Sequence, residues 1–347
     1  MLGLSADALI IMLDEIYLRL FLEVIPSDLK LNCIDVQRLI SDYNQGKHSH
    51  RLYGELIKQV YQNNPNSTIG FDYGQYLMPS TLCDFSRTLM TCATLQEVFD
   101  TVERYHYLLG TSYYPCFRYR NGRVSISFLF PFKRRPSMHQ RRFCVEAILS
   151  YILNAIKETT GESPAPLAVY LDYSAPTYEA LYHKELNVIP TFDSPLNLIE
   201  FDADILKLPL RSHKPVLHQM YLNKCIDAWR ASERLQEFEY RVISYMMLHH
   251  PSAYLSQNLA NKLNISVRGL QKRLNKQGGS FSHLANLSRA ELAKMYLFQE
   301  QQSIDFIAEQ LGFQTLSGFR RFFKTEFNQT PLEFISQMSQ HSESKAS

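Results

Sequence analysis

Apolar side chains recur at helical spacing through residues 1–112. Near the N-terminus the apolar positions fall three and four residues apart, so that they share one face of an amphipathic helix: Leu9, Met12, Leu13, Ile16 and Leu20. Similar patterns predict further helices at residues 36–42, 53–63, 80–91 and 95–109. This part of the chain is therefore predicted to be mainly helical.

The pattern changes from helix to strand after residue 112. Residues 117–120 and 123–130 are rich in aromatic and β-branched side chains, and Asn121-Gly122 separates them. A type I′ turn needs a positive φ at both central positions, so this pair predicts a β-hairpin. In the second run apolar residues alternate with serines, which is typical of a half-buried strand: Val124, Ser125, Ile126, Ser127 and Phe128.

Short strands and helices alternate from residue 142 onward. A helix at residues 142–159 is followed by Gly161 and by a Pro164/Pro166 pair, which end it. The pattern then predicts a strand, a helix, two short strands and a helical connection at residues 167–173, 177–185, 191–192, 198–201 and 206–234. The predicted fold class is an α+β N-terminal domain, a helical half plus a small sheet, followed by an all-α C-terminal domain.

The C-terminal part contains an approximate duplication, of which the second copy is the clearer. Ser303 is a good N-cap for an apolar helical pattern over residues 304–311, and Ala308 in its middle is small enough for a crossing helix. Gly312 supplies a left-handed residue that ends this helix. A new helix begins near Thr315 or Ser317 and carries phenylalanines on one face: Phe319, Phe322, Phe323 and Phe327.

The first copy repeats this organisation at residues 256–274. Ser256 and Ser266 are the predicted N-caps, Ala260 is the small residue at the crossing, and Asn264 takes the turn position that glycine has in the second copy. Two helices joined by such a turn form a helix-turn-helix, whose second helix enters the major groove of DNA. Between the copies, residues 282–300 predict one continuous helix, long enough to hold two recognition helices about one DNA turn apart.

Charge and composition support this interpretation without deciding it. The net charge of the chain is only +2, but residues 251–333 contain ten Lys/Arg against six Asp/Glu, so the basic excess is C-terminal. The six cysteines form no CxxC pair and have no histidine at ligand spacing, which indicates free thiols in a reducing cytoplasm. Charged residues interrupt the apolar N-terminus, which therefore predicts neither a signal peptide nor a membrane span.

The chain resembles the AraC/XylS family of transcription regulators over residues 236–335. In the first unit and the following helix the resemblance lies in residues 270–274, in Gly278 with Phe281, and in residues 289–294. In the second unit it lies in residues 304–313 and in four single positions: Ser317, Phe319, Phe323 and Pro331. Residues 20–210 also resemble the N-terminal effector domain of one non-cupin branch of this family, in Ile69-Gly70, Tyr73-Gly74 and residues 80–82 and 95–97.

The resemblance implies that outward residues of the two recognition helices contact DNA. Carried over to this sequence, the candidate DNA-binding residues are Arg268, Gln271, Lys272 and Arg273 in the first helix and Leu316, Ser317, Arg320, Arg321 and Lys324 in the second. The implied domains are an effector-binding domain (1–210), a helical linker (211–235) and a DNA-binding domain (236–335) with units at 256–277 and 304–327. The polar composition of residues 339–347 predicts a disordered tail. The implied partners are operator DNA and RNA polymerase, with a small effector and a homodimer through residues 217–234 as further candidates.

Several features allow two interpretations. Aromatic residues around the hairpin form either core or the lining of an effector pocket: Tyr105, Tyr107, Tyr113, Tyr119 and Phe128. Residues 133–135 and Arg141-Arg142 are favoured as a solvated loop and helix start over a binding site for nucleic acid or an anionic ligand. The pairs His48/His50 and His249/His250 are favoured as surface histidines over a metal site.

Three functional hypotheses follow. The first is a ligand-responsive transcription activator, cytoplasmic and without cofactor. The second is a DNA-binding regulator without a small ligand, controlled by its own level or by a protein partner. The third is an enzyme fused to a DNA-binding domain, with Cys116 as the nucleophile; it is disfavoured because Phe117 stands where DNA-repair methyltransferases have histidine.

Overall fold

The structure, a computed structural model, describes residues 17, 20–25, 49–80, 84–105, 113–130, 137–231, 235–248, 251–276, 279–300 and 302–336. Several predictions lie outside these residues: most of the N-terminal amphipathic helix, the helix at 36–42, Tyr107, the basic run at 133–135, the histidines 48, 249 and 250, and the tail at 339–347. Among the described residues, no helix has the length and apolar character needed to cross a bilayer.

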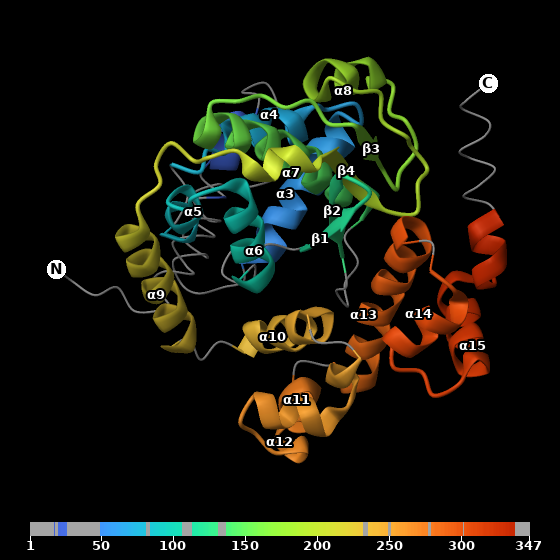
Figure 1. Cartoon of the computed structure of the whole chain (residues 1–347). Helices are drawn as coiled ribbons and strands as arrows, with labels where there is room; N and C mark the ends of the chain where they lie inside the picture. Colours follow the sequence, from blue (N-terminus) through green and yellow to red (C-terminus); the bar gives the residue numbers. More distant parts are fainter. Residues whose placement is uncertain are drawn as a thin grey trace.

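The N-terminal domain consists of helices around a small sheet (Figure 1). Its helices are α3 (Ser49–Asn63), α4 (Ile69–Tyr76), α5 (Asp84–Met90), α6 (Leu95–Tyr105), α7 (Met138–Thr160), α8 (Glu179–Leu186) and α9 (Pro215–Ala231), with a short 3-10 helix η2 (Ala203–Lys207). Its strands are β1 (Tyr114–Arg120), β2 (Arg123–Leu129), β3 (Ala168–Tyr170) and β4 (Asn197–Asp202). The α+β prediction for this half is confirmed.

The sheet has the strand order β1-β2-β4-β3, and each neighbouring pair is antiparallel. The predicted hairpin joins β1 to β2, with Asn121 at φ 51° and Gly122 at φ 73°. Both central residues therefore have the positive φ that a type I′ turn requires.

The prediction that β2 is half-buried is wrong, because both faces of the sheet are covered. Val124, Ile126 and Phe128 pack in the core of the N-terminal domain together with α7, but Ser125 and Ser127 are also buried, with 6% and 0% of their surface exposed. In the sequence, serines at alternate positions of a strand indicate a face that is exposed to solvent. A helix of the C-terminal domain covers that face, and this was not evident from local alternation.

α7 forms the centre of the N-terminal domain. Its start is a capping box, in which the Ser137 hydroxyl accepts from the Gln140 backbone N–H and the Gln140 side chain accepts from the Ser137 N–H. The helix ends at Gly161, whose φ is 83°, and the sequence had predicted the helix end at this glycine. The helix thus extends four residues earlier than the apolar pattern alone predicted.

Two other helical segments differ from the sequence prediction. α4 was not predicted as a helix, because Gly70 and Gly74 interrupt its pattern. The connection predicted as helix from residue 206 begins its helix only at Pro215, after η2 and an extended segment. Proline at the first helical position explains this start. The first backbone N–H groups of a helix have no partner within the helix, so proline, which lacks an N–H, loses no hydrogen bond there.

Replacing Gly74 with alanine is expected to lower the free energy of unfolding by about 1–3 kcal/mol. α4 lies so close to α7 that an added methyl group would clash with the Ala147 carbonyl oxygen and would lie 2.7 Å from the Ser150 Cβ. Urea unfolding of the full chain measures the change, with the exposed neighbour replaced (Gln75→Ala) as the control. Equal stability of the two variants would contradict the close approach of these helices.

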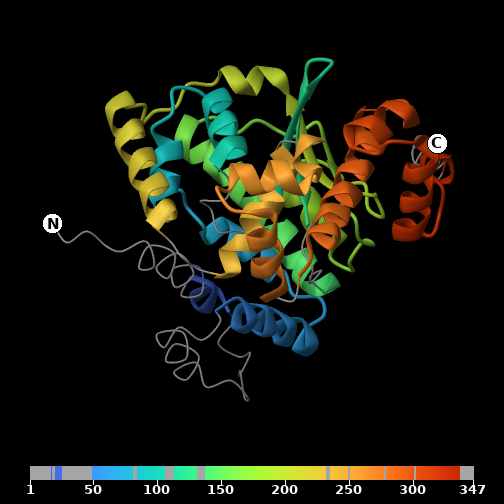
Figure 2. The same ribbon diagram turned by 90° about the horizontal axis from the view of Figure 1, so that it is seen from below.

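The C-terminal domain is all-helical, as predicted. Its elements are α10 (Leu235–Leu248), η3 (Ser252–Tyr254), α11 (Ser256–Lys262), α12 (Val267–Lys276), α13 (Phe281–Met295), η4 (Tyr296–Glu300), α14 (Ile304–Gln310) and α15 (Leu316–Phe327). The two views place α11–α12 and α14–α15 on opposite sides of α13 (Figures 1 and 2). The long connecting helix was predicted to be regular throughout, but it ends in a π-helical turn, η4.

Candidate nucleic-acid interface

The second helix-turn-helix unit consists of α14 and α15. The Ser303 hydroxyl caps α14 by accepting from the Phe306 N–H at 3.2 Å, and Gly312 at φ 72° follows its end. The Thr315 hydroxyl then caps α15 by accepting from the Gly318 N–H at 3.1 Å. The Ser303 cap and the Gly312 turn therefore lie where the sequence predicted, and α15 begins directly after Thr315, one of its two predicted starts.

The first unit, α11 and α12, has the same design with two differences. The Ser266 hydroxyl accepts from the Gly269 N–H at 3.0 Å, and Asn264 occupies the turn at φ 53°. The prediction that Ser256 caps α11 is wrong, because the cap position is Leu255 and Ser256 is already helical. The turn residue is asparagine here and glycine in the second unit, because both tolerate a left-handed backbone.

Each unit has an apolar core that sets the position of its second helix. Ala260 is fully buried and Ala308 is buried in the same position of the second unit. Phe319 and Phe323 of α15 are fully buried, whereas Phe322 and Phe327 are partly buried against the same cluster. These phenylalanines are core residues, so the opposite face of α15 is left for contacts with a partner.

Arg289 of α13 connects the two units. Its guanidinium lies 4.3 Å from the ring centre of Tyr254, ahead of the first unit, and 4.9 Å from that of Phe313, in the turn of the second. Its Nε also donates to the Leu311 carbonyl at 2.9 Å. One side chain therefore links η3, which directly precedes the first unit, to the turn of the second unit through two cation–π contacts and a charge-assisted hydrogen bond.

The structure places nearly all candidate DNA-binding residues on the surface. In α12 and α15 the exposed candidates are Arg268, Gln271, Lys272, Arg273, Ser317, Arg320, Arg321 and Lys324. Leu316 is the exception, since it is partly buried against the core of the domain. Arg273 is directed toward α10, with its guanidinium 5.4 Å from the Phe238 ring centre. The other exposed candidates lie on α12 and α15, the second helices of the two units.

These two helices carry excess positive charge. α12 contains four basic residues and no acidic one, and α15 contains three basic residues and Glu326. Within the described ranges, neither Arg268, Lys272 nor Arg320 makes an ion pair or a side-chain hydrogen bond. Side chains of this kind neutralise phosphates and donate to base edges in the major groove, which admits a helix. Fold and surface together define a DNA-binding protein with two helix-turn-helix units.

Comparison with known proteins gives the family. Residues 36–210 match the arabinose-binding domain of AraC transcription regulators, and residues 259–337 match a helix-turn-helix domain. The chain therefore belongs to the AraC family of DNA-binding transcription regulators. It is a transcription regulator and not an enzyme.

Similar individual proteins come from two comparisons. The ornithine utilization regulator of Pseudomonas aeruginosa is 22% identical over 296 residues, which cover 85% of this chain and 86% of that protein. Among solved structures, the transcriptional regulator CdpR of Pseudomonas aeruginosa matches with a TM-score of 0.42 and 16% identity, covering 86% of this chain and 97% of that one. A DNA-binding transcriptional dual regulator of Escherichia coli K-12 matches with a TM-score of 0.26 and 23% identity, covering 29% of this chain and 96% of that one.

The aromatic residues predicted around the hairpin do not form one group. Phe128 is buried and its ring centre lies 5.9 Å from that of Tyr113, so these two are neighbours. Tyr119 is 46% exposed and its hydroxyl accepts from Gln96, and Tyr105 packs in a separate cluster with Phe85. The structure therefore brings together two of the four described candidates.

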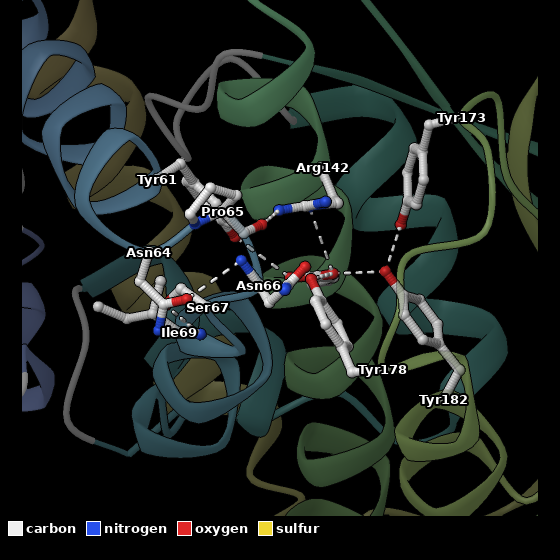
Figure 3. Close-up of polar contacts among 11 residues, drawn as sticks. Tyr61, Asn64, Pro65, Asn66, Ser67, Ile69, Arg142, Tyr173, Tyr178 and Tyr182 are labelled. Atoms are coloured by element: carbon white, nitrogen blue, oxygen red, sulfur yellow. Dashed lines mark hydrogen bonds and ion pairs between the residues drawn. The ribbon is translucent and has the colours of Figure 1, made fainter.

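A polar network that the sequence did not reveal lies inside the N-terminal domain (Figure 3). The Glu146 carboxylate of α7 is fully buried and accepts hydrogen bonds from the hydroxyls of Tyr61, Tyr178 and Tyr182. The Arg142 guanidinium lies 4.7 Å from the Tyr61 ring centre and donates to a backbone carbonyl at 2.6 Å. Burial raises the pKa of Glu146 to about 7.

The interpretation of Arg141-Arg142 as a solvated helix start is wrong. The Arg142 side chain is 13% exposed, and Arg141 Nη1 forms an ion pair with Asp172 at 2.5 Å. Consecutive arginines look solvated in a sequence, but here a buried carboxylate network surrounds one and a distant aspartate pairs with the other. Their partners lie 4 and 31 residues away along the chain.

The N-terminal sheet packs directly on the DNA-binding domain. Cys116 of β1 is buried with its Sγ 3.3 Å from the Met295 sulfur at the end of α13, and the Tyr170 and Phe298 ring centres are 5.2 Å apart. Sheet residues therefore share one apolar cluster with all the helices of the C-terminal domain. Cys116, the nucleophile of the third hypothesis, is a packing residue at this contact.

Replacing Gln271 or Lys272 with alanine is expected to weaken binding to the cognate site by about 1–3 kcal/mol each if the side chain reads a base edge. Both residues are exposed on α12, so folding should not change. Gel-shift titrations on cognate and random DNA measure the effect, with the exposed, distant Lys207→Ala as the control. An equal loss on both DNAs would show phosphate contacts instead, and no loss would contradict the assignment of α12 as a recognition helix.

Proposed function

We propose that this regulator is a ligand-responsive transcription activator, which binds operator DNA through α12 and α15 and acts on RNA polymerase. The observation that carries the DNA-binding part of the proposal is the pair of exposed basic helices, α12 and α15, packed in one domain around α13. The proposed domains are residues 1–210 for regulation, 211–235 for the connection and 236–335 for DNA binding. The proposed DNA contacts are those of the two helices named above.

Ligand response is supported by the direct contact between the two domains. The sheet and α13 share an apolar cluster, so a change in the sheet can reach α13 through direct contact rather than through the connection at residues 211–235. A ligand that favours one arrangement of this contact shifts the population of the DNA-bound form. The aromatic pair Tyr113 and Phe128 remains part of the proposed effector-binding region.

Two experiments test this function. Genome-wide mapping of binding sites identifies the operators, and a reporter gene under one operator shows whether transcription rises or falls with the protein. We expect a rise that depends on a small molecule. A rise independent of every metabolite tested would favour the second candidate, control by protein level or a partner, and a fall would overturn activation.

Dimerisation through α9 is part of the proposal. α9 exposes large apolar side chains, with Val216 72% and Met220 61% exposed. A second copy would cover this face and, by joining two DNA-binding domains, raise the effective concentration at the second half-site. Trp229 lies further along the same helix.

The double replacement Val216→Asp, Met220→Asp is expected to convert a dimer into a monomer. Charges at a dry interface lose hydration without a partner, whereas on an exposed monomer surface they cost little. Analytical ultracentrifugation at micromolar concentration, with and without operator DNA, measures the state. A wild-type protein that is monomeric in both conditions would refute the dimer and leave DNA binding untouched.

A further inference from the structure

A small cavity of about 30 Å³ lies between the N-terminal domain and α13, partly open to the surface. Four charged side chains line it: Arg141 and Asp172 from the N-terminal domain, and Glu291 and Lys294 from α13. Phe128 and Leu196 form an apolar wall beside them. The cavity is therefore built by both domains, and it is neither apolar nor of one charge.

The charges are arranged as two ion pairs, one in each domain. Arg141 Nη1 lies 2.5 Å from Asp172 Oδ2, and Lys294 Nζ lies 2.9 Å from Glu291 Oε1. The carboxylate side chains are 10% and 8% exposed. Within the described residues no ion pair joins the two domains at this cavity. The charged groups of each pair can therefore form further hydrogen bonds with a group inside the cavity.

One of these pairs has buried atoms that are not satisfied. Among the described residues, neither Arg141 Nε nor Asp172 Oδ1 has a hydrogen-bond partner, although both are buried. The first is a donor and the second an acceptor, and both belong to residues that line the cavity. Buried polar atoms are normally paired, so an unpaired donor and an unpaired acceptor on two residues that line the same cavity leave bonding capacity there for a group of mixed polarity.

We propose that this cavity binds the head group of an α-amino acid, which is the effector of the regulator. A carboxylate on the ligand would accept from Arg141 and Lys294, and its ammonium would donate to Asp172 and Glu291. The four protein charges sum to zero, so a simple anion or a simple cation meets as much repulsion as attraction, whereas a zwitterion satisfies both signs. This inference rests on the ligand response proposed above.

The size of the cavity sets how the ligand lies. About 10–15 Å³ of such space holds one water molecule, so the cavity accommodates a few head-group atoms at most. The ligand side chain must therefore extend toward the open side, past the apolar wall of Phe128 and Leu196. Because two of the four charged residues lie on α13, a bound amino acid bridges the domains and stabilises their contact.

Calorimetric titration of the full chain tests the proposal with matched probes. L-alanine has both charged groups, propionate lacks the ammonium and ethylamine lacks the carboxylate; the other common amino acids follow L-alanine in the same titration. We expect at least one amino acid to bind, with its deaminated and decarboxylated analogues at least tenfold weaker. Asp172→Asn and Lys294→Met should each weaken binding at least tenfold, and Lys207→Met, which alters an exposed ion pair with Asp204, should not.

The outcomes distinguish a failure of the proposed amino-acid site from a failure of the proposed DNA-binding function. No binding of any common amino acid by a chain that still binds its operator would overturn the effector site and leave DNA recognition standing. Propionate binding as tightly as the amino acid would overturn the zwitterion assignment, and this comparison needs no variant. Unchanged affinity in both Asp172→Asn and Lys294→Met would place the ligand elsewhere and overturn the proposal.

Discussion

An Arg289→Met protein is expected to lose about 2–4 kcal/mol of stability in its C-terminal domain. The loss combines two partly buried cation–π contacts with the charge-assisted hydrogen bond to the Leu311 carbonyl. Methionine preserves much of the apolar volume, so the effect isolates the guanidinium. Urea unfolding followed by intrinsic fluorescence measures the change.

The same variant should also bind DNA differently. Arg289 contacts Tyr254 in η3, directly before the first unit, and Phe313 and Leu311 in the second unit, so its loss is expected to loosen the coupling between their positions. We expect affinity for the complete operator to fall at least tenfold, with a smaller loss on a site that one unit alone contacts. Arg320→Met is the matched control: it removes an exposed arginine of α15 and should lower affinity without lowering stability. Equal stability of Arg289→Met and wild type would contradict the coupling role.

The stability of the wild-type protein is expected to fall between pH 5 and pH 8 because of Glu146. Its folded pKa is raised to about 7 from an ordinary value of 4.5, and burial is the main cause. The folded state therefore keeps a proton that the unfolded state has lost. The resulting stabilisation is complete below pH 4.5 and is lost as the pH rises through about 7. At roughly 1.4 kcal/mol for each unit of difference in pKa, the contribution is about 3 kcal/mol.

Glu146→Gln isolates this contribution. The amide stays neutral at every pH and keeps an acceptor oxygen for the hydroxyls of Tyr178 and Tyr182. Unfolding free energies at pH 5, 6, 7 and 8 should decline more steeply in the wild type than in this variant, whose remaining slope comes from other groups. Parallel curves for the two proteins would refute the raised pKa.

The local features of the DNA-binding domain could be predicted from the sequence because short-range rules determine them. A serine three residues before a backbone N–H, and a glycine or asparagine after an apolar helical run, specify the caps and turns at Ser266, Asn264, Ser303 and Gly312. The Asn121-Gly122 hairpin follows the same logic. Where the sequence allowed two helix starts, at Thr315 or at Ser317, only the structure showed that the Thr315 hydroxyl is the cap.

The features that the sequence did not reveal depend on distant partners. The network around Glu146 joins Tyr61 with Tyr178, more than a hundred residues apart along the chain, and no local pattern indicates that they meet. Ser127 looked solvent-facing because the helix that covers the sheet belongs to another domain. α4 was missed because Gly70 and Gly74 weaken its helical signal, and the close approach to α7 that requires small residues is tertiary. The cavity at Arg141 and Lys294 has the same origin.

Hydroxyl-radical footprinting of the full chain on an operator selected from random DNA tests the central claim most directly. If α12 and α15 are both recognition helices, the protein should protect two segments on one face of the duplex, about one helical turn apart. Gln271→Ala should weaken one segment, and Arg320→Ala the other. A single protected segment that both variants weaken alike, or protection without any sequence preference, would contradict the account.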